Sequence, residues 1–166
     1  IVAFANDSAY SAAYGIATVA DEIILSRSGG VGSVGVVTQH TDVSEAMAKR
    51  GVKVTFMYSG KHKTDGNQFE PLPADVKARI EARIERIYGE FVGIIAANRG
   101  MEGSAVRATE ALTYDASDAI EVGFADRVGD IDEALAAFEE GANTENLNMT
   151  TFTQDQMDAA IAAAKT

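Results

Sequence analysis

A serine that follows a short apolar run is the residue of this sequence best suited to covalent chemistry. The run IVAFAN is followed by DSAY and then by SAAYG, which opens with Ser11. This order predicts a strand, a tight turn and a helix, with Ser11 near the helix N-terminus. Free N–H groups there would stabilise an oxyanion, and the small Ala12 and Ala13 leave room for a substrate carbonyl. Ser8 competes with Ser11 on the same pattern, and Ser11 could also be only a helix N-cap.

A serine nucleophile needs a base, and the sequence offers two kinds. The two histidines are His40, which follows a predicted strand, and His62, which lies in a loop, and no spacing supports a Ser–His–Asp triad. A neutral lysine is the other known base. Lys61 and Lys63 lie in a glycine-containing loop after a predicted strand, although each could equally be a solvated surface residue.

Alternating strands and helices must position these residues. The predicted strands are 1–6, 22–26, 34–39, 52–59 and a short one at 125–129. The predicted helices are 11–20, Thr41 or Asp42 to Arg50, 74–99, Ser104–Ala111, one after Asp115 that stops at Gly123, and 131–139. A glycine-rich turn is expected at 28–32 and a polar loop at 60–73. This alternation predicts an α/β domain with a largely parallel sheet.

The second half of the chain predicts one long helix and a domain boundary. The helix at 74–99 has an apolar stripe that we expect to be buried, formed by Val76, Ile80, Ile84, Ile87, Phe91 and Ile94. Residues 141–151 are polar and predict a linker. A last helix is predicted from Thr153, whose capping box is completed by Gln156. The sequence therefore predicts a folded domain over 1–140 and a linker with a further segment over 141–166.

The composition excludes several kinds of protein. The 166 residues are 46% hydrophobic and 23% charged, as in a globular domain, and the formal net charge of −11 disfavours nucleic acid and anionic membranes as partners. Without cysteine there is no disulfide or thiolate metal site, and we expect no metal and no cofactor. No apolar run approaches the roughly 20 residues of a membrane span. The chain opens on a buried-strand pattern without Met, so we expect further residues upstream.

Three segments of the sequence together resemble the signal-peptide-peptidase family of serine–lysine peptidases. AYSAAYGIATVADEIILS and the following GGVGSVGVV are similar to its nucleophile region, and GVKVTFMYSGKHKTDGNQFEPLP is similar to its lysine loop, S-G-x-[HY]-K. The stretch Y-S-G-x-H-K-x-D-G-N is similar in particular to the head-assembly (capsid) peptidases of lambda-like tailed phages. The resemblance covers about residues 1–140. It implies a Clp-protease/crotonase-like α/β spiral of βα units, with its first strands upstream of this chain.

The resemblance also implies a role for individual residues. Ser11 corresponds to the nucleophile and Lys63 to the general base, while Ser33 orients the lysine amine and the Ala12 N–H is an oxyanion donor. The family's second donor lies in a glycine-rich turn upstream of the nucleophile strand, and this chain does not contain that turn. A lysine base must be desolvated, because a free lysine has a pKa of about 10.4 and a base needs roughly 7–8.

The function implied is that of a serine endopeptidase with a Ser–Lys dyad that processes scaffold or portal proteins in phage head assembly. Its substrate would be a protein or peptide, its location the cytoplasm of the infected host within the assembling prohead, and its assembly a homo-oligomeric ring in which neighbouring subunits share the dyad. Two alternatives stay open. One is a cellular signal-peptide peptidase with a membrane anchor upstream, and the other is an inactive oligomeric assembly module on the same fold.

Overall fold

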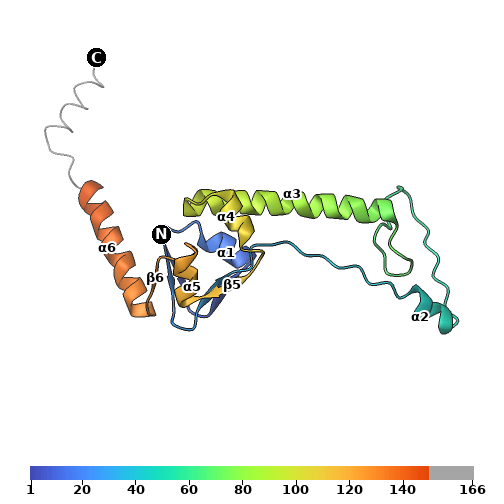
Figure 1. The fold of residues 1–166 in the computed structure, drawn as a ribbon, viewed down its shortest axis with the longest axis horizontal. Coiled ribbons are helices and arrows are strands. Elements are labelled where there is room, and N and C mark those ends of the chain that lie inside the picture. The colour runs from blue at the N-terminus through green and yellow to red at the C-terminus, as the bar shows by residue number, and fades with distance from the viewer. Residues whose placement is uncertain (150–166) are drawn as a thin grey trace, which may run out of the picture. The chain divides into compact units, whose positions relative to one another are not determined.

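In the computed structural model, which describes residues 1–149, the chain divides into two units. The first comprises Ile1–Ser33 together with the chain from Leu112 onward, and we call it the sheet unit. The second comprises Val34–Ala111, and we call it the helical unit. Figure 1 traces both along the chain, from blue at the N-terminus to red at the C-terminal helix.

The sheet unit contains two three-stranded sheets. In the first, β1 (Val2–Ala5), β3 (Glu22–Leu25) and β6 (Arg127–Val128) are all parallel, in the order β1-β3-β6. In the second, β2 (Ser8–Tyr10) is parallel to β4 (Gly30–Gly32), and β4 is antiparallel to β5 (Thr113–Asp115). The helices of this unit are α1 (Ala12–Ala17), α5 (Ala116–Glu121) and α6 (Ile131–Met149).

The centre of the sheet unit is buried on both faces of β3. Ile23, Ile24 and Leu25 are fully buried, which is the pattern of a parallel strand covered on both sides. The edge of the sheet is fixed by polar contacts to the β6 region. Asp126 accepts a hydrogen bond from the Ile23 N–H (2.7 Å), and Arg127 donates one to Glu22 (2.6 Å). Segments about 100 residues apart are thereby joined at one sheet.

The helical unit contains α2 (Ser44–Lys49), α3 (Ala74–Arg99) and α4 (Gly103–Ala108). The helix α3 ends at Gly100, whose left-handed φ of 64° suits glycine. Arg107 of α4 lies over the Tyr88 ring at 4.6 Å and pairs with Glu85 at 3.2 Å, so α4 is fastened to α3. None of the helices in residues 1–149 is long and apolar enough to cross a membrane.

The prediction of an α/β fold with parallel strands is confirmed at this level, and so are the strands at 1–6, 22–26 and 125–129 and the helix at 74–99. The apolar stripe of that helix is confirmed only in part. Val76 is buried, but Ile94 is 53% exposed, while Val92 and Ile95 are buried. The buried face of α3 therefore rotates along its length away from the predicted positions.

The strands predicted at 34–39 and 52–59 are wrong. Both segments are extended, but within residues 1–149 neither pairs with a strand. The alternation in VKVTFMYS indicates a segment suited to a sheet, yet a strand exists only with a neighbour. Val37 and Met57 are 92% and 96% exposed, although Val34 at the start of the first segment is fully buried.

Smaller corrections concern the ends of elements. The helix predicted from Thr41 or Asp42 begins at Ser44, because the Asp42 side chain accepts the Ser44 N–H (2.8 Å) outside the helix. The glycine-rich segment predicted as a turn contains β4, and the short strands β2 and β5 were not predicted. The helix α6 continues through 141–149, where a polar linker was predicted. The helix predicted from Thr153 lies outside the described residues, and the boundary at residue 140 stays a prediction.

Candidate active site

Ser11 lies at the junction of β2 and α1 with an unusual backbone conformation. Its φ of 54° and ψ of −123° fall outside the regions that side chains favour. Such strain costs free energy, and it persists where the surrounding structure imposes it, typically at functional sites. A serine on a strained turn between a strand and a helix is the arrangement of a nucleophile elbow, which presents the hydroxyl at the end of the sheet.

The geometry separates Ser11 from the two simpler interpretations. Ser11 occupies the N-cap position of α1, but its side chain makes no capping hydrogen bond and its backbone is not in the extended region that N-caps adopt. The hydroxyl is therefore not used to begin the helix. Ser8 lies within β2, opposite Gly30 in the parallel ladder, and precedes no helix. Of the two serines, only Ser11 has an elbow geometry.

Ser33 lies beside Ser11 at the carboxyl ends of two neighbouring strands. In the parallel pair of β2 and β4, Tyr10 is opposite Gly32, and the Ser11 N–H donates to the Gly32 carbonyl (2.8 Å). The next residues in register are Ser11 and Ser33. Ser33 also has a positive φ, of 55°, and its N–H donates to the Leu112 carbonyl (2.8 Å).

Gly32 is required for this approach of the two serines. Its φ is 113°, and a Cβ atom there would lie 2.6 Å from the Leu112 carbonyl oxygen. Any side chain would push β4 away from the residue that holds the Ser33 N–H. The glycine of the G-S-V-G motif thus has a structural reason in this chain.

The aromatic residue after the two alanines anchors α1 in the core. Tyr14 is fully buried, and its hydroxyl donates to the Phe124 carbonyl (3.0 Å). Its ring packs on Phe124 with 4.9 Å between centroids, and Tyr114 meets Phe124 edge-on at 5.7 Å. These contacts fix the helix whose first residue, Ala12, has an N–H in the turn where a helix has no acceptor of its own. The role of that N–H as an oxyanion donor stays a prediction.

Lys63 belongs to the helical unit. Of the three predicted residues, the structure therefore has Ser11 and Ser33 in the sheet unit and Lys63 in the helical unit. It lies in the turn at 61–66, which we call the lysine turn. The Lys63 N–H donates to the Gly60 carbonyl (3.0 Å), and the side chain is exposed. The prediction that the lysine lies in a loop is confirmed, and its role as base stays a prediction.

Sequence reasoning missed the charged residues around the lysine turn. Arg79 of α3 donates to Asp65 of the turn (2.6 Å) and to Asp75 of α3 (2.8 Å). The Arg79 guanidinium lowers the pKa of both carboxyl groups below their usual range, and these carboxylates raise the pKa of Arg79. The four-residue spacing of Asp75 and Arg79 was a visible signal for one of these contacts. The sequence gives no signal for the contact between Arg79 and Asp65.

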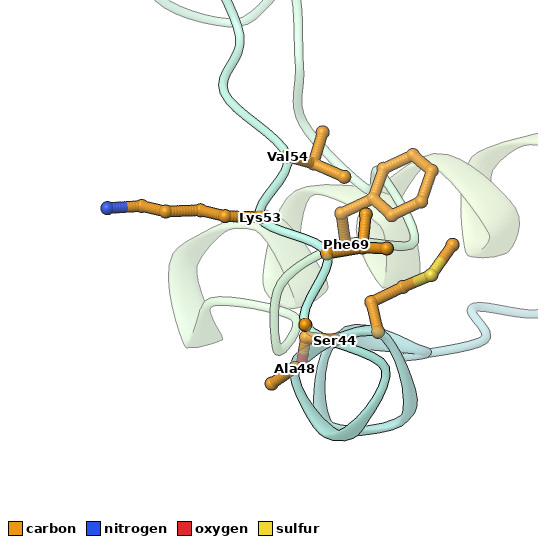
Figure 2. A pocket seen from close by; sticks show the side chains of 8 residues that line it. Ser44, Ala48, Lys53, Val54 and Phe69 are labelled. Atoms are coloured by element: carbon orange, nitrogen blue, oxygen red, sulfur yellow. The ribbon is translucent and has the colours of Figure 1, made fainter.

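A hollow of about 440 Å³ in the helical unit lies between α2 and the following chain. Its lining includes Met47, Val52, Val54 and Phe69. Figure 2 shows Val54 and Phe69 side by side, whereas the Lys53 side chain extends away from them. The lining of the hollow is mixed, because Ser44 and Lys53 also contribute to it, and Ser11 lies in the other unit.

Comparisons with known proteins address the family of this chain. The model of peptidase family S49 matches residues 1–145. The head-tail preconnector protein GP5 of Enterobacteria phage P21 is 35% identical over 98% of this chain and 32% of its own length. Capsid assembly protease C of Escherichia phage lambda is 30% identical over 97% of this chain and 37% of its own length. The chain thus spans about a third of the length of these two relatives.

Other similarities are more distant. A putative signal peptide peptidase SppA of Enterococcus faecium is 30% identical over 80% of this chain and 39% of its own length. Among solved structures, the membrane-bound stomatin-specific protease 1510-N has a TM-score of 0.46 at 15% identity, over 82% of this chain and 54% of that one. Since the family model covers most of the sequence, including Ser11, Ser33 and Lys63, this chain belongs to peptidase family S49.

Proposed function

We propose that this chain is the catalytic part of a serine endopeptidase in which Ser11 is the nucleophile and Lys63 the general base. The observation that carries the proposal is the strained backbone of Ser11 at the β2–α1 junction, with Ser33 next to it in register. Strain at a serine that does not cap its helix is most simply explained by a demand on its hydroxyl. Membership of a peptidase family supports the same conclusion.

The chemistry follows from these roles. The Lys63 amine accepts the proton of the Ser11 hydroxyl, and the oxygen attacks a peptide carbonyl. The Ala12 N–H donates to the oxyanion that develops, and one such donor contributes about 3–4 kcal/mol to the transition state. Lys63 then gives its proton to the leaving amine and later activates water, which releases the acyl group. The Ser33 hydroxyl accepts a hydrogen bond from the lysine amine and orients it.

A lysine base must be shielded from water, and Lys63 is exposed in the single chain. The helical unit also exposes large apolar side chains, at Val37, Val52, Phe56, Met57 and Tyr58. Exposed apolar surface of this kind is typical of protein contacts. We infer a closed homo-oligomer in which subunit contacts cover the helical unit and exclude water from the lysine turn.

The phage relatives favour a role in head assembly. One is named a capsid assembly protease and another a head-tail preconnector protein, and both match nearly the whole of this chain. We infer that the full-length protein cleaves scaffold or portal proteins in the host cytoplasm, within the assembling prohead. The signal-peptide-peptidase alternative predicts cleavage of signal peptides instead, and the assembly-module alternative predicts oligomers without cleavage.

The test uses the full-length protein with the scaffold and portal proteins of its phage. The wild type is expected to cleave at least one of them, and Ser11→Ala to cleave neither. Ser8→Ala is the matched control, since Ser8 lies three residues before Ser11, in the strand β2 that leads to it. This variant is expected to retain activity. Cleavage that survives Ser11→Ala and is lost in Ser8→Ala would overturn the assignment. Assembly without cleavage in the wild type would favour the inactive module.

A further inference from the structure

The turn that carries Lys63 is fastened to α3 by one arginine with two carboxylate partners. Arg79 Nη1 donates to Asp75 Oδ2 (2.8 Å), a residue of the same helix. Arg79 Nη2 donates to Asp65 Oδ2 (2.6 Å), which lies 14 residues upstream in the lysine turn. The first contact stays within α3, whereas the second crosses to the turn, where Arg79 Nη2 also lies 3.2 Å from His62 Nδ1. Arg79 therefore connects α3 to the turn that carries Lys63, at a residue two positions after Lys63.

The segment behind the lysine turn has its own internal hydrogen bonds. The Asn67 side chain donates to the Thr64 carbonyl (2.9 Å) and accepts from the Phe69 N–H (2.9 Å). The Asn67 carbonyl oxygen lies 2.8 Å from His40 Nε2. These bonds define the shape of the loop but do not attach it to α3. That attachment comes from the Asp65–Arg79 pair and from the contact between Arg79 and His62.

The charges of the Asp65–Arg79 pair, which we call the clamp, are maintained at neutral pH. The Arg79 guanidinium keeps the pKa of Asp65 below its usual range, so the carboxylate stays ionised. His62, the neighbour of Lys63, also lies in the cluster, with Nδ1 3.0 Å from Asp65 Oδ2 and 3.2 Å from Arg79 Nη2. The residues on both sides of Lys63, His62 and Asp65, therefore reach the same arginine.

We infer that Arg79 is a positioning residue that acts through Asp65 to hold the lysine turn and thus present the Lys63 amine. The inference rests on the proposed function. A general base must come within about 3 Å of the proton that it takes, and a displacement of about 1 Å can cost 10²-fold in rate. Lysine has a long flexible side chain, and a mobile turn would further widen the range of positions that its amine can take. A clamp at Asp65 removes the motion of the backbone.

The two carboxylate partners of Arg79 provide a matched pair of variants for the full-length enzyme. Asp65→Asn removes the ion pair that joins α3 to the turn, and Asp75→Asn removes the ion pair that stays within α3. With fluorescently labelled casein as substrate, we expect Asp65→Asn to lower kcat by about 10- to 100-fold with KM nearly unchanged, because substrate contacts remain. Asp75→Asn is expected to stay within about threefold of the wild type, as the link to the turn is intact.

The arginine itself is tested with two substitutions. Arg79→Met is expected to match Asp65→Asn, and the double variant to be no worse than either single one, because both substitutions remove the Asp65–Arg79 ion pair. Arg79→Lys is expected to recover part of kcat by restoring a charge. Arg86→Met is the control on the same helix, since Arg86 pairs with Glu90 (2.9 Å), and it is expected to have wild-type kcat.

The outcomes separate the positioning role of Arg79 from the proposed Ser–Lys dyad. If Asp65→Asn keeps kcat within twofold of the wild type, or if Asp65→Asn and Asp75→Asn lose equal activity, Arg79 does not position the base. Asp65→Asn retains nearly the same shape, so this test stands even where circular dichroism shows that Arg79→Met is unfolded. If Lys63→Ala retains the full activity of the wild-type enzyme, the Ser–Lys proposal itself is refuted, and the positioning role with it.

Discussion

The two units hold their reactive residues by different means. In the sheet unit, Ser11 and Ser33 are fixed by backbone hydrogen bonds at the ends of β2 and β4, above a buried aromatic cluster. In the helical unit, Lys63 lies on an exposed turn held by charged side chains, of which Arg79 is 44% exposed. Exposed ion pairs contribute little individually and weaken with salt. The comparison indicates that the proposed nucleophile is built into the fold, whereas the proposed base depends on contacts that further burial would strengthen.

The largest effect that would test this comparison is loss of the base. We expect Lys63→Ala to reduce kcat/KM as far as Ser11→Ala does, by about 10⁴-fold or more, because the two residues act as one unit. The double variant should be no worse than either single one. Peptidase assays on purified full-length protein provide the measurement.

Two neighbours of Lys63 serve as controls. Lys61→Ala is expected to be nearly silent, since Lys61 is at the variable position of the S-G-x-H-K motif. A pH–rate profile whose acid limb disappears in His62→Ala would show a histidine base, and would contradict the division of the dyad between the two units.

Sharing of the dyad between subunits gives the next effect. Inactive Ser11→Ala and Lys63→Ala protomers, mixed in equal amounts after reversible dissociation, are expected to recover activity. In a ring with random exchange, about a quarter of the sites would pair an intact Ser11 with an intact Lys63. Light scattering and a labelled subunit would verify exchange. No recovery despite exchange would mean that each protomer supplies both residues itself.

A smaller effect tests the buried support of the nucleophile. Tyr14→Phe removes the hydrogen bond to the Phe124 carbonyl and leaves that acceptor buried without its donor. We expect the free energy of unfolding to fall by about 1–2 kcal/mol in urea titrations. Tyr58→Phe is the control, because Tyr58 is exposed, and it should change stability by less than about 0.5 kcal/mol. Equal losses in both variants would contradict the anchoring role of Tyr14.

The smallest effect concerns the clamp on the lysine turn. A carboxyl group whose pKa is lowered in the folded state stabilises it above the ordinary pKa of about 3.9, and this contribution is lost as the pH falls through the lowered value. The Asp65 pair should therefore persist at neutral pH and be released only in acid. Carbon-13 NMR titration of the Asp65 carboxyl is expected to show a midpoint below 3.9 that rises in Arg79→Met and not in Arg86→Met. An unchanged midpoint in Arg79→Met would exclude the pair.

The sequence predicted the elements whose signals are local. The apolar run before Ser11, the glycine after it in G-S-V-G, and the periodicity of α3 are each contained in one short segment, and all three correspond to observed structure. The helix-start pattern of Ser11 could not reveal its positive φ, because the strain comes from the ladder between β2 and β4. Contacts between distant segments, such as Arg79 with Asp65 or Tyr14 with Phe124, leave no local pattern.

The two failed strand predictions have the opposite cause. The segment at 52–59 has the alternation of a strand, but pairing depends on a second segment that the local pattern does not specify. The alternation therefore indicates only that this segment could pair with another strand. Met57 of the segment is exposed. The polar character of 141–149 was misleading in another way, since the helix α6 continues through these polar residues.

The hydrogen bond from the Ser33 N–H to the Leu112 carbonyl has a consequence for how the protein can be altered. The chain leaves the sheet unit after Ser33 and returns at Leu112, and this bond holds the two ends of that excursion 2.8 Å apart at the peptide groups. Val34–Ala111 is thus topologically an insertion with adjacent ends, the kind of site where domains tolerate replacement. The proposed nucleophile and the proposed base are consequently carried on separable modules, and exchanging this insertion between family members would change the loop of Lys63 while leaving the sheet that carries Ser11 uninterrupted.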